Sequence, residues 1–188
     1  YYVGRMMYTV ALVVLVSILT LMVAMPLTII IARLKNFWRS TWVVLLLTSL
    51  ALSEVLTAYA WQIILSKSSG LPGWLEGLGL LTDANSWWPG FPAMLLVLVY
   101  FSIPIAMVML LPPLSRMDGS LSDTARMMGF SKIEVFWRVT LPVLRRPIFQ
   151  TGLLLFLLNS GGFVISQQLG RPSDWMFSVF IADFMRSF

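Results

Sequence analysis

The chain has 188 residues, of which 59% are hydrophobic and 11% charged, and its formal net charge is +5 at pH 7. A soluble domain averages roughly 45–50% apolar and about 25% charged residues, so most of the apolar side chains here are expected to face lipid. Cysteine and histidine are both absent, which excludes a disulfide scaffold and a zinc or haem site built on those ligands. The basic residues fall between hydrophobic runs rather than along one polar face, so we expect no nucleic-acid partner.

Four runs are long and apolar enough to cross a bilayer, which takes about 20 helical residues. They predict spans over residues 7–32, 41–65, 90–114 and 146–168, with Glu54 as the one acidic residue inside them. A shorter apolar stretch at residues 175–188 predicts the start of a further helix. Because the chain has no initiator methionine and this stretch stops abruptly, we expect a piece of a longer protein. The sequence predicts an all-α integral membrane protein with a single transmembrane domain, residues 1–188.

Basic residues are concentrated in two of the connections between these runs. The loop after the first run and the loop between the third and fourth runs carry most of them, whereas the opposite side mixes three basic with three acidic residues. By the positive-inside rule, we expect both basic loops to be cytoplasmic and both ends of the chain to be extracytoplasmic. The basic residues in these two loops are Arg33, Lys35, Arg39, Arg116, Arg126, Lys132, Arg138, Arg145 and Arg146.

The second basic loop, residues 115–145, contains signals for two short helices. Residues 120–123 and 131–134 both fit capping boxes, in which a serine and an acidic residue three positions later satisfy the first amides of a helix. Gly129 is a natural stop between them, since glycine tolerates the left-handed conformation at a helix end. Four apolar residues should then share one face of the second helix, and Pro142 is expected to redirect the chain into the last span. These four are Ile133, Phe136, Trp137 and Leu141.

Two interpretations of this loop remain open from the residue pattern alone. The two helices could form a rigid projection that a soluble partner grips to transmit force. They could instead lie in the membrane interface as simple connectors, as amphipathic helices often do.

The spacing of the loop residues resembles a known motif. Asp123-Thr124-Ala125, then Gly129, then Arg138-Val139-Thr140-Leu141-Pro142 is similar to the EAA loop of binding-protein-dependent ABC importer permeases. That family has Glu-Ala-Ala, a glycine after a short spacer, and Ile-x-Leu-Pro further on. This chain differs by Asp for Glu, Thr for the first Ala, and Val139 for Ile. The differences concern fine contacts with the ATPase rather than membership.

Other segments are most similar to the spermidine/putrescine-type branch of these permeases. They are Tyr59-Ala60-Trp61, Gly70-Leu71-Pro72, Gly161-Gly162-Phe163-Val164 and Leu169-Gly170-Arg171-Pro172-Ser173. The resemblance implies a type I importer permease core, with four full transmembrane helices and two short cytoplasmic coupling helices in this chain. By the same comparison, the family's first and last spans are missing from it.

The resemblance also implies partners and a location. A second permease subunit would complete a homodimer or heterodimer in the bacterial inner membrane, two ATPase subunits would dock on the EAA loops, and an extracytoplasmic binding protein would deliver the solute. A polyamine or related cation is the favoured solute, with ferric ion, thiamine or sulfate as alternatives. The chain has no GxxxxGK[ST] motif, so it is predicted to be non-catalytic and to hold no cofactor, with ATP and Mg²⁺ bound by the ATPase. The expected coupling residues are Asp123, Ala125, Met128, Gly129, Phe130, Leu141 and Pro142.

Five residues inside the spans are candidates for a solute pathway. A carboxylate near mid-span is costly, so Glu54 should face protein or water, either as a contact for a cationic solute or as a partner in a subunit contact. Asn159 allows the same two interpretations, with interhelical hydrogen bonding as its structural role. Tyr59, Trp61 and Tyr100 could recognise an amine through cation–π contacts, although aromatic residues in spans commonly serve packing.

Three other classes of membrane protein are alternatives to the importer. A secondary transporter or channel would not need a capped cytoplasmic projection, and would be expected to have discontinuous helices and further ionisable groups. A membrane-embedded enzyme would need a catalytic set inside the spans, for which this chain supplies almost no residues. A purely structural membrane subunit remains a third alternative.

Overall fold

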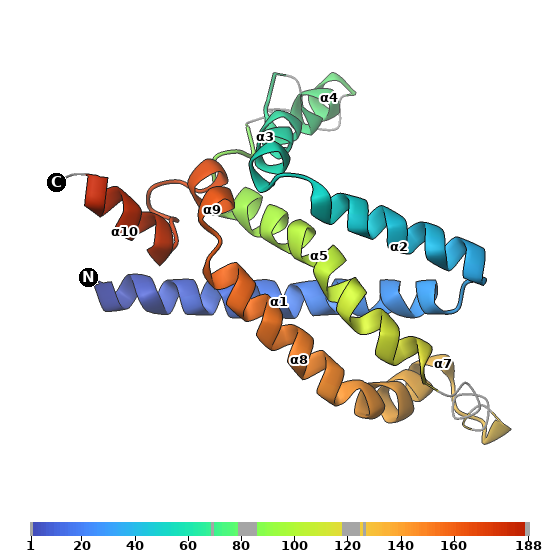
Figure 1. Ribbon diagram of the computed structural model, residues 1–188. Coiled ribbons are helices and arrows are strands. Elements are labelled where there is room, and N and C mark those ends of the chain that lie inside the picture. The colour runs from blue at the N-terminus through green and yellow to red at the C-terminus, as the bar shows by residue number, and fades with distance from the viewer. Residues whose placement is uncertain (1, 69, 79–85, 118–124, 126, 187–188) are drawn as a thin grey trace.

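The computed structural model describes residues 2–68, 70–78, 86–117, 125 and 127–186. Throughout this part of the chain all regular secondary structure is helical (Figure 1), as predicted. Three helices form the main bundle: α1 (Tyr2–Ala32), α5 (Phe91–Ser115) and α8 (Leu141–Ser160). α5 lies at the centre and packs against α1, α8, α2 and α9. The bundle therefore surrounds one almost wholly apolar helix.

The second predicted span is not one straight helix. It consists of α2 (Asn36–Ala51) and α3 (Glu54–Leu65), which meet at an angle of 95°. Leu52 and Ser53 between them are extended, with ψ angles of 139° and 132°. The described residues thus contain three helices long and apolar enough to span a membrane, or four if the bent pair counts as one span.

The last predicted span is interrupted as well. α8 ends at Ser160, and α9 (Phe163–Leu169) begins after the pair Gly161-Gly162. A side chain at Gly162 would bring a Cβ atom 3.0 Å from the carbonyl oxygen of Asn159, so the close turn here suits glycine. Residues 146–168 therefore hold two helices separated by a break. The physical reason is the loss of helix stability at two successive glycines.

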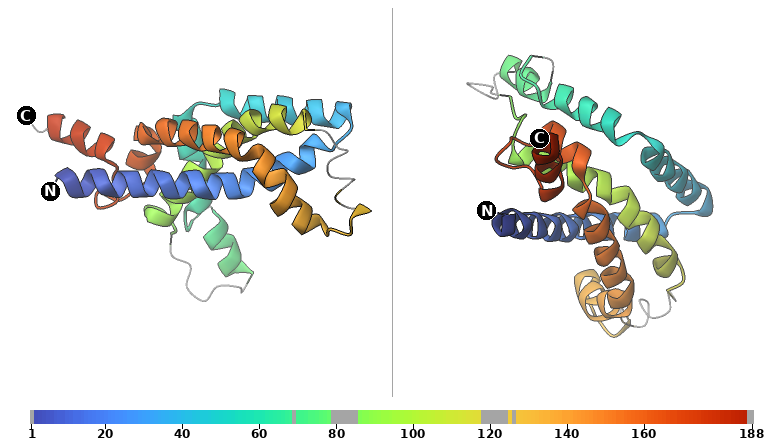
Figure 2. Two further views of the ribbon diagram at one scale, coloured as in Figure 1. Left: turned by 90° about the horizontal axis from the view of Figure 1, so that it is seen from below. Right: turned by 60° about the vertical axis from the view of Figure 1, so that its left-hand side comes forward.

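Hydrogen bonds join the segments at the end of the molecule where the chain termini lie. The backbone N–H of Gly90 donates to the carbonyl oxygen of Leu169 at 2.9 Å, and the indole N–H of Trp88 donates to that of Gln168 at 2.8 Å. The short helix α4 (Leu71–Gly77) projects from the bundle nearby, and α10 (Phe177–Arg186) packs against α1 (Figure 2). Hydrogen bonds to backbone carbonyls therefore hold this end together.

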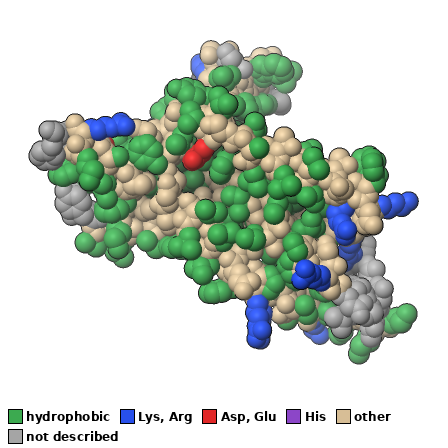
Figure 3. All heavy atoms as spheres, in the orientation of Figure 1, with side chains coloured by type: hydrophobic (Ala, Val, Ile, Leu, Met, Phe, Trp, Pro, Cys, Tyr) green, Lys and Arg blue, Asp and Glu red, His purple; other side chains and the backbone are tan. Residues whose placement is uncertain are grey.

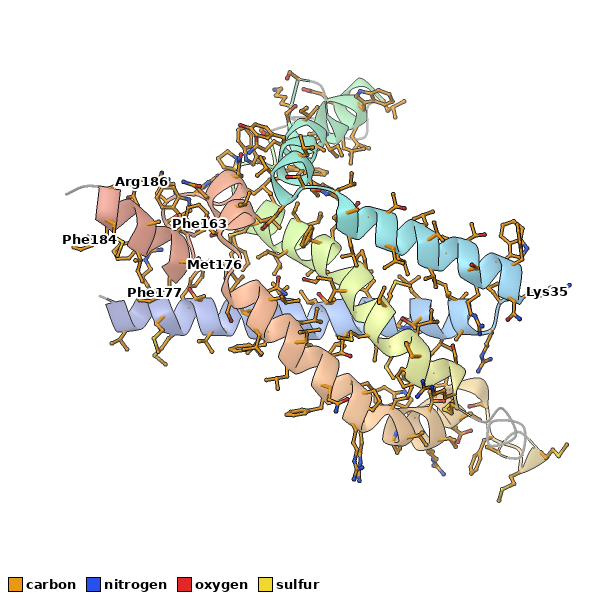
Figure 4. The ribbon with its side chains drawn as sticks, viewed as in Figure 1. Lys35, Phe163, Met176, Phe177, Phe184 and Arg186 are labelled. Carbon is orange, nitrogen blue, oxygen red and sulfur yellow. The ribbon has the colours of Figure 1, made fainter. Side chains whose placement is uncertain are left out.

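The opposite end carries the two basic connections. Lys35 marks it, far from Phe184 and Arg186 in α10 (Figure 4). We call it the basic end, defined by Arg33, Lys35 and Arg39 after α1 and by Arg138 and Arg145 at the start of the last helical run. Hydrophobic side chains are spread over the face between the two ends that Figure 3 shows. Both basic loops lying at one end agrees with the topology predicted from the sequence.

One polar pair is buried between α5 and α8. The Asn159 amide Nδ2 donates to Ser102 Oγ at 2.9 Å, and the Ser102 hydroxyl can donate back to Asn159 Oδ1 at 3.2 Å. Nδ2 also donates to the carbonyl oxygen of Leu155 at 2.9 Å, one turn back along α8. The interhelical hydrogen bond predicted for Asn159 is thus present, and its partner is on the central helix.

A double-mutant cycle tests the energy of this pair. We expect Ser102→Ala and Asn159→Ala to show a coupling of about 0.6 kcal/mol and at most about 1.7 kcal/mol, the range found for interhelical hydrogen bonds in membranes. Thermal or denaturant unfolding of the purified protein in detergent would measure it. Ser160→Ala is the matched control, because Ser160 Oγ bonds only within its own helix, to Phe156. Equal coupling of Asn159 to Ser160 would show that the interaction with Ser102 is not specific.

Candidate functional site

The loop at the basic end has the glycine stop that the sequence predicts. Gly129 has φ +88° and is the one described residue in the left-handed backbone region. The backbone N–H of Phe130 donates to the carbonyl oxygen of Ala125 at 3.2 Å. This bond spans five residues across a left-handed glycine, which is the Schellman arrangement of a helix end. The helix stop at Gly129 is confirmed.

The second capping box is also confirmed. The backbone N–H of Ser131 donates to Glu134 Oε2 at 2.9 Å, and the backbone N–H of Glu134 donates to Ser131 Oγ at 3.3 Å. These reciprocal bonds open α7 (Lys132–Val135). The first capping box, at residues 120–123, and the expected contact Asp123 lie outside the described residues.

The second coupling helix differs from the prediction in one respect. It does not end before the last span but continues through η1 (Phe136–Thr140), a π-helical turn, directly into α8. The N–H of Leu141 bonds the carbonyl of Phe136, five residues back. Because Pro142 has no N–H to continue the regular pattern, a widened turn just before it is physically reasonable. Pro142 therefore lies inside a continuous helical run, which bends where η1 meets α8 (Figure 1).

Some of the expected coupling residues are exposed, and others are buried or half-buried. Met128 is 73% exposed, and its neighbour Met127, which was not predicted as a contact, is 90% exposed. Ala125 is buried, and the half-buried ring of Phe130 lies under the guanidinium of Arg138, 5.3 Å from ring centre to Cζ. The methionines thus offer an adaptable apolar surface.

The predicted apolar face of the second helix is divided in the same way. Ile133 and Trp137 are exposed, whereas Phe136 and Leu141 pack on the core near Met25 and Leu110. The exposed pair adds to the surface offered by the methionines, and the packed pair fixes this helix to α1 and α5.

Glu54 and Asn159, predicted from separate runs, line one cavity. Its volume is about 230 Å³, and it lies where α3, α5, α8 and α9 meet. Polar groups are few and convergent there, as in many small-molecule sites. The other lining residues are Leu98, Phe101, Ser102, Ile105, Leu158, Gly161, Gly162 and Ile165.

The Glu54 carboxylate has a partner within the chain. It lies toward the backbone N–H of Ile165, the third residue of α9, with which it interacts favourably, and both residues line the cavity. The first amides of a helix lack partners inside the helix and carry partial positive charge, so a carboxylate there stabilises the helix end. Glu54 begins α3, the second half of the first broken span, and its carboxylate lies near the start of α9, the helix that follows the second break.

The aromatic candidates separate into a pair and an outlier. Trp61 and Tyr100 meet edge to face, with ring centres 5.2 Å apart, and both line a second hollow of about 330 Å³. Tyr59 is half exposed and lines neither hollow. Two of the three aromatic residues are therefore together, but not in the cavity that holds Glu54.

Sequence reasoning missed Ser102 and the role of the glycine pair at the second break. Gly161-Gly162 inside an apolar run is itself a signal for a break in the helix. No pattern in the sequence marks Ser102, because a single serine in an apolar helix does not indicate which neighbouring helix it contacts.

Comparisons with known proteins place the chain in a family. Residues 3–187 match the family described as binding-protein-dependent transport system inner membrane component. A spermidine/putrescine transport system permease protein PotC homolog of Mycoplasma genitalium is 24% identical over 160 residues, covering 81% of this chain and 51% of that protein. PotB of Escherichia coli, of the same transport system, is 25% identical over 154 residues, covering 82% and 56%. A probable ABC transporter permease of Brucella abortus is 29% identical over 163 residues, covering 82% and 55%.

The fold and the site together define a helical membrane permease. The chain belongs to the binding-protein-dependent transport system inner membrane component family, the permeases of type I ABC importers. It spans about half the length of the curated relatives it matches. The family resemblance stated from the loop residues is confirmed.

The left-handed glycine gives a direct structural prediction. A Cβ atom at Gly129 would meet no atom within 4 Å, so any penalty comes from the backbone conformation. We expect Gly129→Ala to cost about 1–2 kcal/mol locally, which would speed hydrogen exchange of the Phe130 amide by roughly tenfold. Gly129→Asn should exchange close to wild type, because asparagine tolerates this conformation. Equal exchange in the alanine variant and wild type would contradict the assigned turn.

Proposed function

We propose that this chain is the core of a permease subunit that moves a small solute across the bacterial inner membrane. The energy for transport comes from ATP that separate ATPase subunits hydrolyse, and an extracytoplasmic binding protein delivers the solute. The observation that carries the proposal is the loop at the basic end. There, a glycine-stopped helix end and a capped helix present exposed methionines and aromatics beside a helix that runs into the bundle.

The helical continuity suggests how force would travel. Residues 132–160 form one helical run through η1, which at 1.5 Å per residue is roughly 40 Å long. An ATPase that grips Met128 and the exposed face of α7 would move this rod as a unit. Its far end is the break at Gly161-Gly162, on the wall of the Glu54 cavity. A push at the loop would therefore reach the cavity through one unbroken helical run, which is bent where η1 meets α8 and contains Pro147 (Figure 2).

A second permease subunit is needed to complete a central pathway in this proposal. The exposed apolar faces of α2 and α3 provide ample surface for it and for lipid. The chain itself would remain non-catalytic, and ATP and Mg²⁺ would bind the ATPase. Whether the pair is a homodimer or a heterodimer is left open by the proposal.

A polyamine or related cation is the solute class that we favour. Two relatives carry spermidine/putrescine transport in their names, and the cavity between the broken helices holds a carboxylate and an amide. Both groups can accept hydrogen bonds from an ammonium. Sulfate fits poorly beside Glu54, because two negative charges would be brought together in a poorly hydrated site. Ferric ion and thiamine, both cationic, remain the alternatives.

A secondary transporter is the second candidate, and one observation favours it. Two interrupted helices meet beside an acidic residue, as in many ion-coupled transporters. The loop geometry and the family membership favour the importer.

Removing the charge of Glu54 distinguishes its contribution to stability from its contribution to binding a cationic solute. Glu54→Gln keeps a side-chain oxygen near the Ile165 N–H but removes the charge at the start of α9, so we expect only a small loss of stability, about 0.3–1 kcal/mol. Uptake of a cationic solute should fall roughly tenfold, since a hydrogen bond to a charged group is worth about 1.5–3 kcal/mol. Glu54→Leu should lower both stability and uptake. Wild-type uptake of polyamine by Glu54→Gln would leave Glu54 with a capping role alone.

Coupling is tested with a charge at the glycine of the loop. In the complete transporter reconstituted in liposomes, Gly129→Asp should abolish the ATPase stimulation that loaded binding protein produces, and uptake with it. The subunit should still insert and assemble. Gly77→Asp is the matched control, since its Cβ also meets no atom within 4 Å and it lies in α4, away from the loop. Normal stimulated hydrolysis in Gly129→Asp would reduce the loop to a connector.

A further inference from the structure

A third hollow, lined mainly by apolar side chains, lies on the outer face of the bundle, between α1 and α8. Its volume is about 430 Å³. One wall is a stripe of α1 and the other a stripe of α8, each at helical spacing. Gly152 forms the close approach between the helices, where an added Cβ would lie 3.3 Å from Leu21 Cδ1. Its apolar walls include Val14, Ile18, Leu21, Phe149, Leu153 and Phe156.

The groove ends at a basic site. Arg145 lines it, and Arg145 and Phe149 also line an adjoining hollow of about 390 Å³ together with Arg146 and Gln150. Neither lining contains an acidic residue. Both arginines are exposed at the basic end. A long apolar slot therefore opens into a site with two guanidinium groups and one amide.

The length of the slot matches one leaflet of a bilayer. Arg145 and Phe156 are 11 positions apart on one helix, which is about 16 Å at 1.5 Å per residue. Half of a hydrocarbon core about 30 Å thick is about 15 Å. A chain whose charged group contacts Arg145 would thus reach the bilayer midplane at Phe156.

We propose that this groove binds an anionic glycerophospholipid. One acyl chain lies between α1 and α8, and the phosphate is held by Arg145 and Arg146, with Gln150 donating to headgroup oxygens. Arginine suits this role because its planar guanidinium donates two parallel hydrogen bonds to phosphate oxygens. Basic sites between helices on the cytoplasmic side are known lipid headgroup sites in general.

The site has a consequence for the proposed transport cycle. The groove lies along the α8 rod, with Leu141 of its first turn in the lining. A bound lipid would pack against the rod that carries motion from the loop. The lipid site itself does not depend on the transport proposal, because it needs only α1, α8 and a bilayer.

The experiment uses the complete transporter in nanodiscs with photoactivatable lipids. Phosphatidylglycerol and phosphatidylcholine, each carrying a diazirine on one acyl chain, are crosslinked separately, and labelled peptides are mapped by mass spectrometry. We expect phosphatidylglycerol to label residues 141–156 about 30-fold more than phosphatidylcholine, equivalent to about 1 kcal/mol for each arginine. Arg145→Gln with Arg146→Gln should reduce that labelling to the phosphatidylcholine level. Leu153→Trp, which fills the groove and keeps the charges, should also abolish it.

Arg33→Gln is the matched control, an exposed arginine at the same end that lines neither hollow. It should leave the labelling unchanged. Equal labelling by both lipids, or equal loss in Arg33→Gln, would overturn the proposal in favour of unspecific surface attraction. Failure of any lipid to label residues 141–156 would overturn it as well, because another helix or the second subunit would then cover the groove. The lipid result can be interpreted even if the transport proposal fails, because photolabelling does not require ATP hydrolysis.

Discussion

The contact between the Glu54 carboxylate and the start of α9 links the two interrupted helices of the bundle. Helices that break inside a membrane expose backbone groups, and lipid offers them no partners. Here α3 begins after the first break with a carboxylate, and α9 begins after the second break with backbone N–H groups of partial positive charge beside it. Each break in a helix therefore supplies a group that stabilises the other break. This pairing explains how two broken helices can coexist in one small bundle.

The same pairing determines where a polar cavity can form. Glu54 holds α3 against α9, Asn159 holds α8 against Ser102 of α5, and the space between these contacts is the cavity. Its walls come from α5, from both sides of the second break, and from α3 after the first break. A movement of α8 would change the cavity directly, because Asn159, Gly161 and Gly162 all lie at the end of that helix.

The sequence predicted well those features that depend on local chemistry. Gly129 and the Ser131–Glu134 box follow from backbone requirements of helix ends, and the structure has both. Apolar run lengths predicted the long helices for a similar reason. The bend at Leu52-Ser53 was missed because neither residue is a helix breaker, so the bend arises from tertiary contacts. The contact of Glu54 with the start of α9 could not be predicted, because it involves a backbone amide more than 100 positions away. Residue types do not indicate such a contact.

The continuation of the second coupling helix into α8 was also beyond sequence reasoning. A proline after a short helix usually signals a break, whereas here a π turn precedes Pro142 and the helix continues past it. The loop and the bundle are therefore joined by one helical run, bent where η1 meets α8, rather than by two separate helices (Figure 1).

Crosslinking at the loop tests the central claim most directly. The chain has no cysteine, so Met128→Cys introduces a single reactive site on the exposed surface of the loop, and Trp74→Cys places an equally exposed one (73%) in α4. In the assembled transporter, the account predicts that Met128→Cys crosslinks to the ATPase subunit and that Trp74→Cys does not. Crosslinking of the ATPase at Trp74, or its absence at Met128 in a complex that still hydrolyses ATP, would contradict the account.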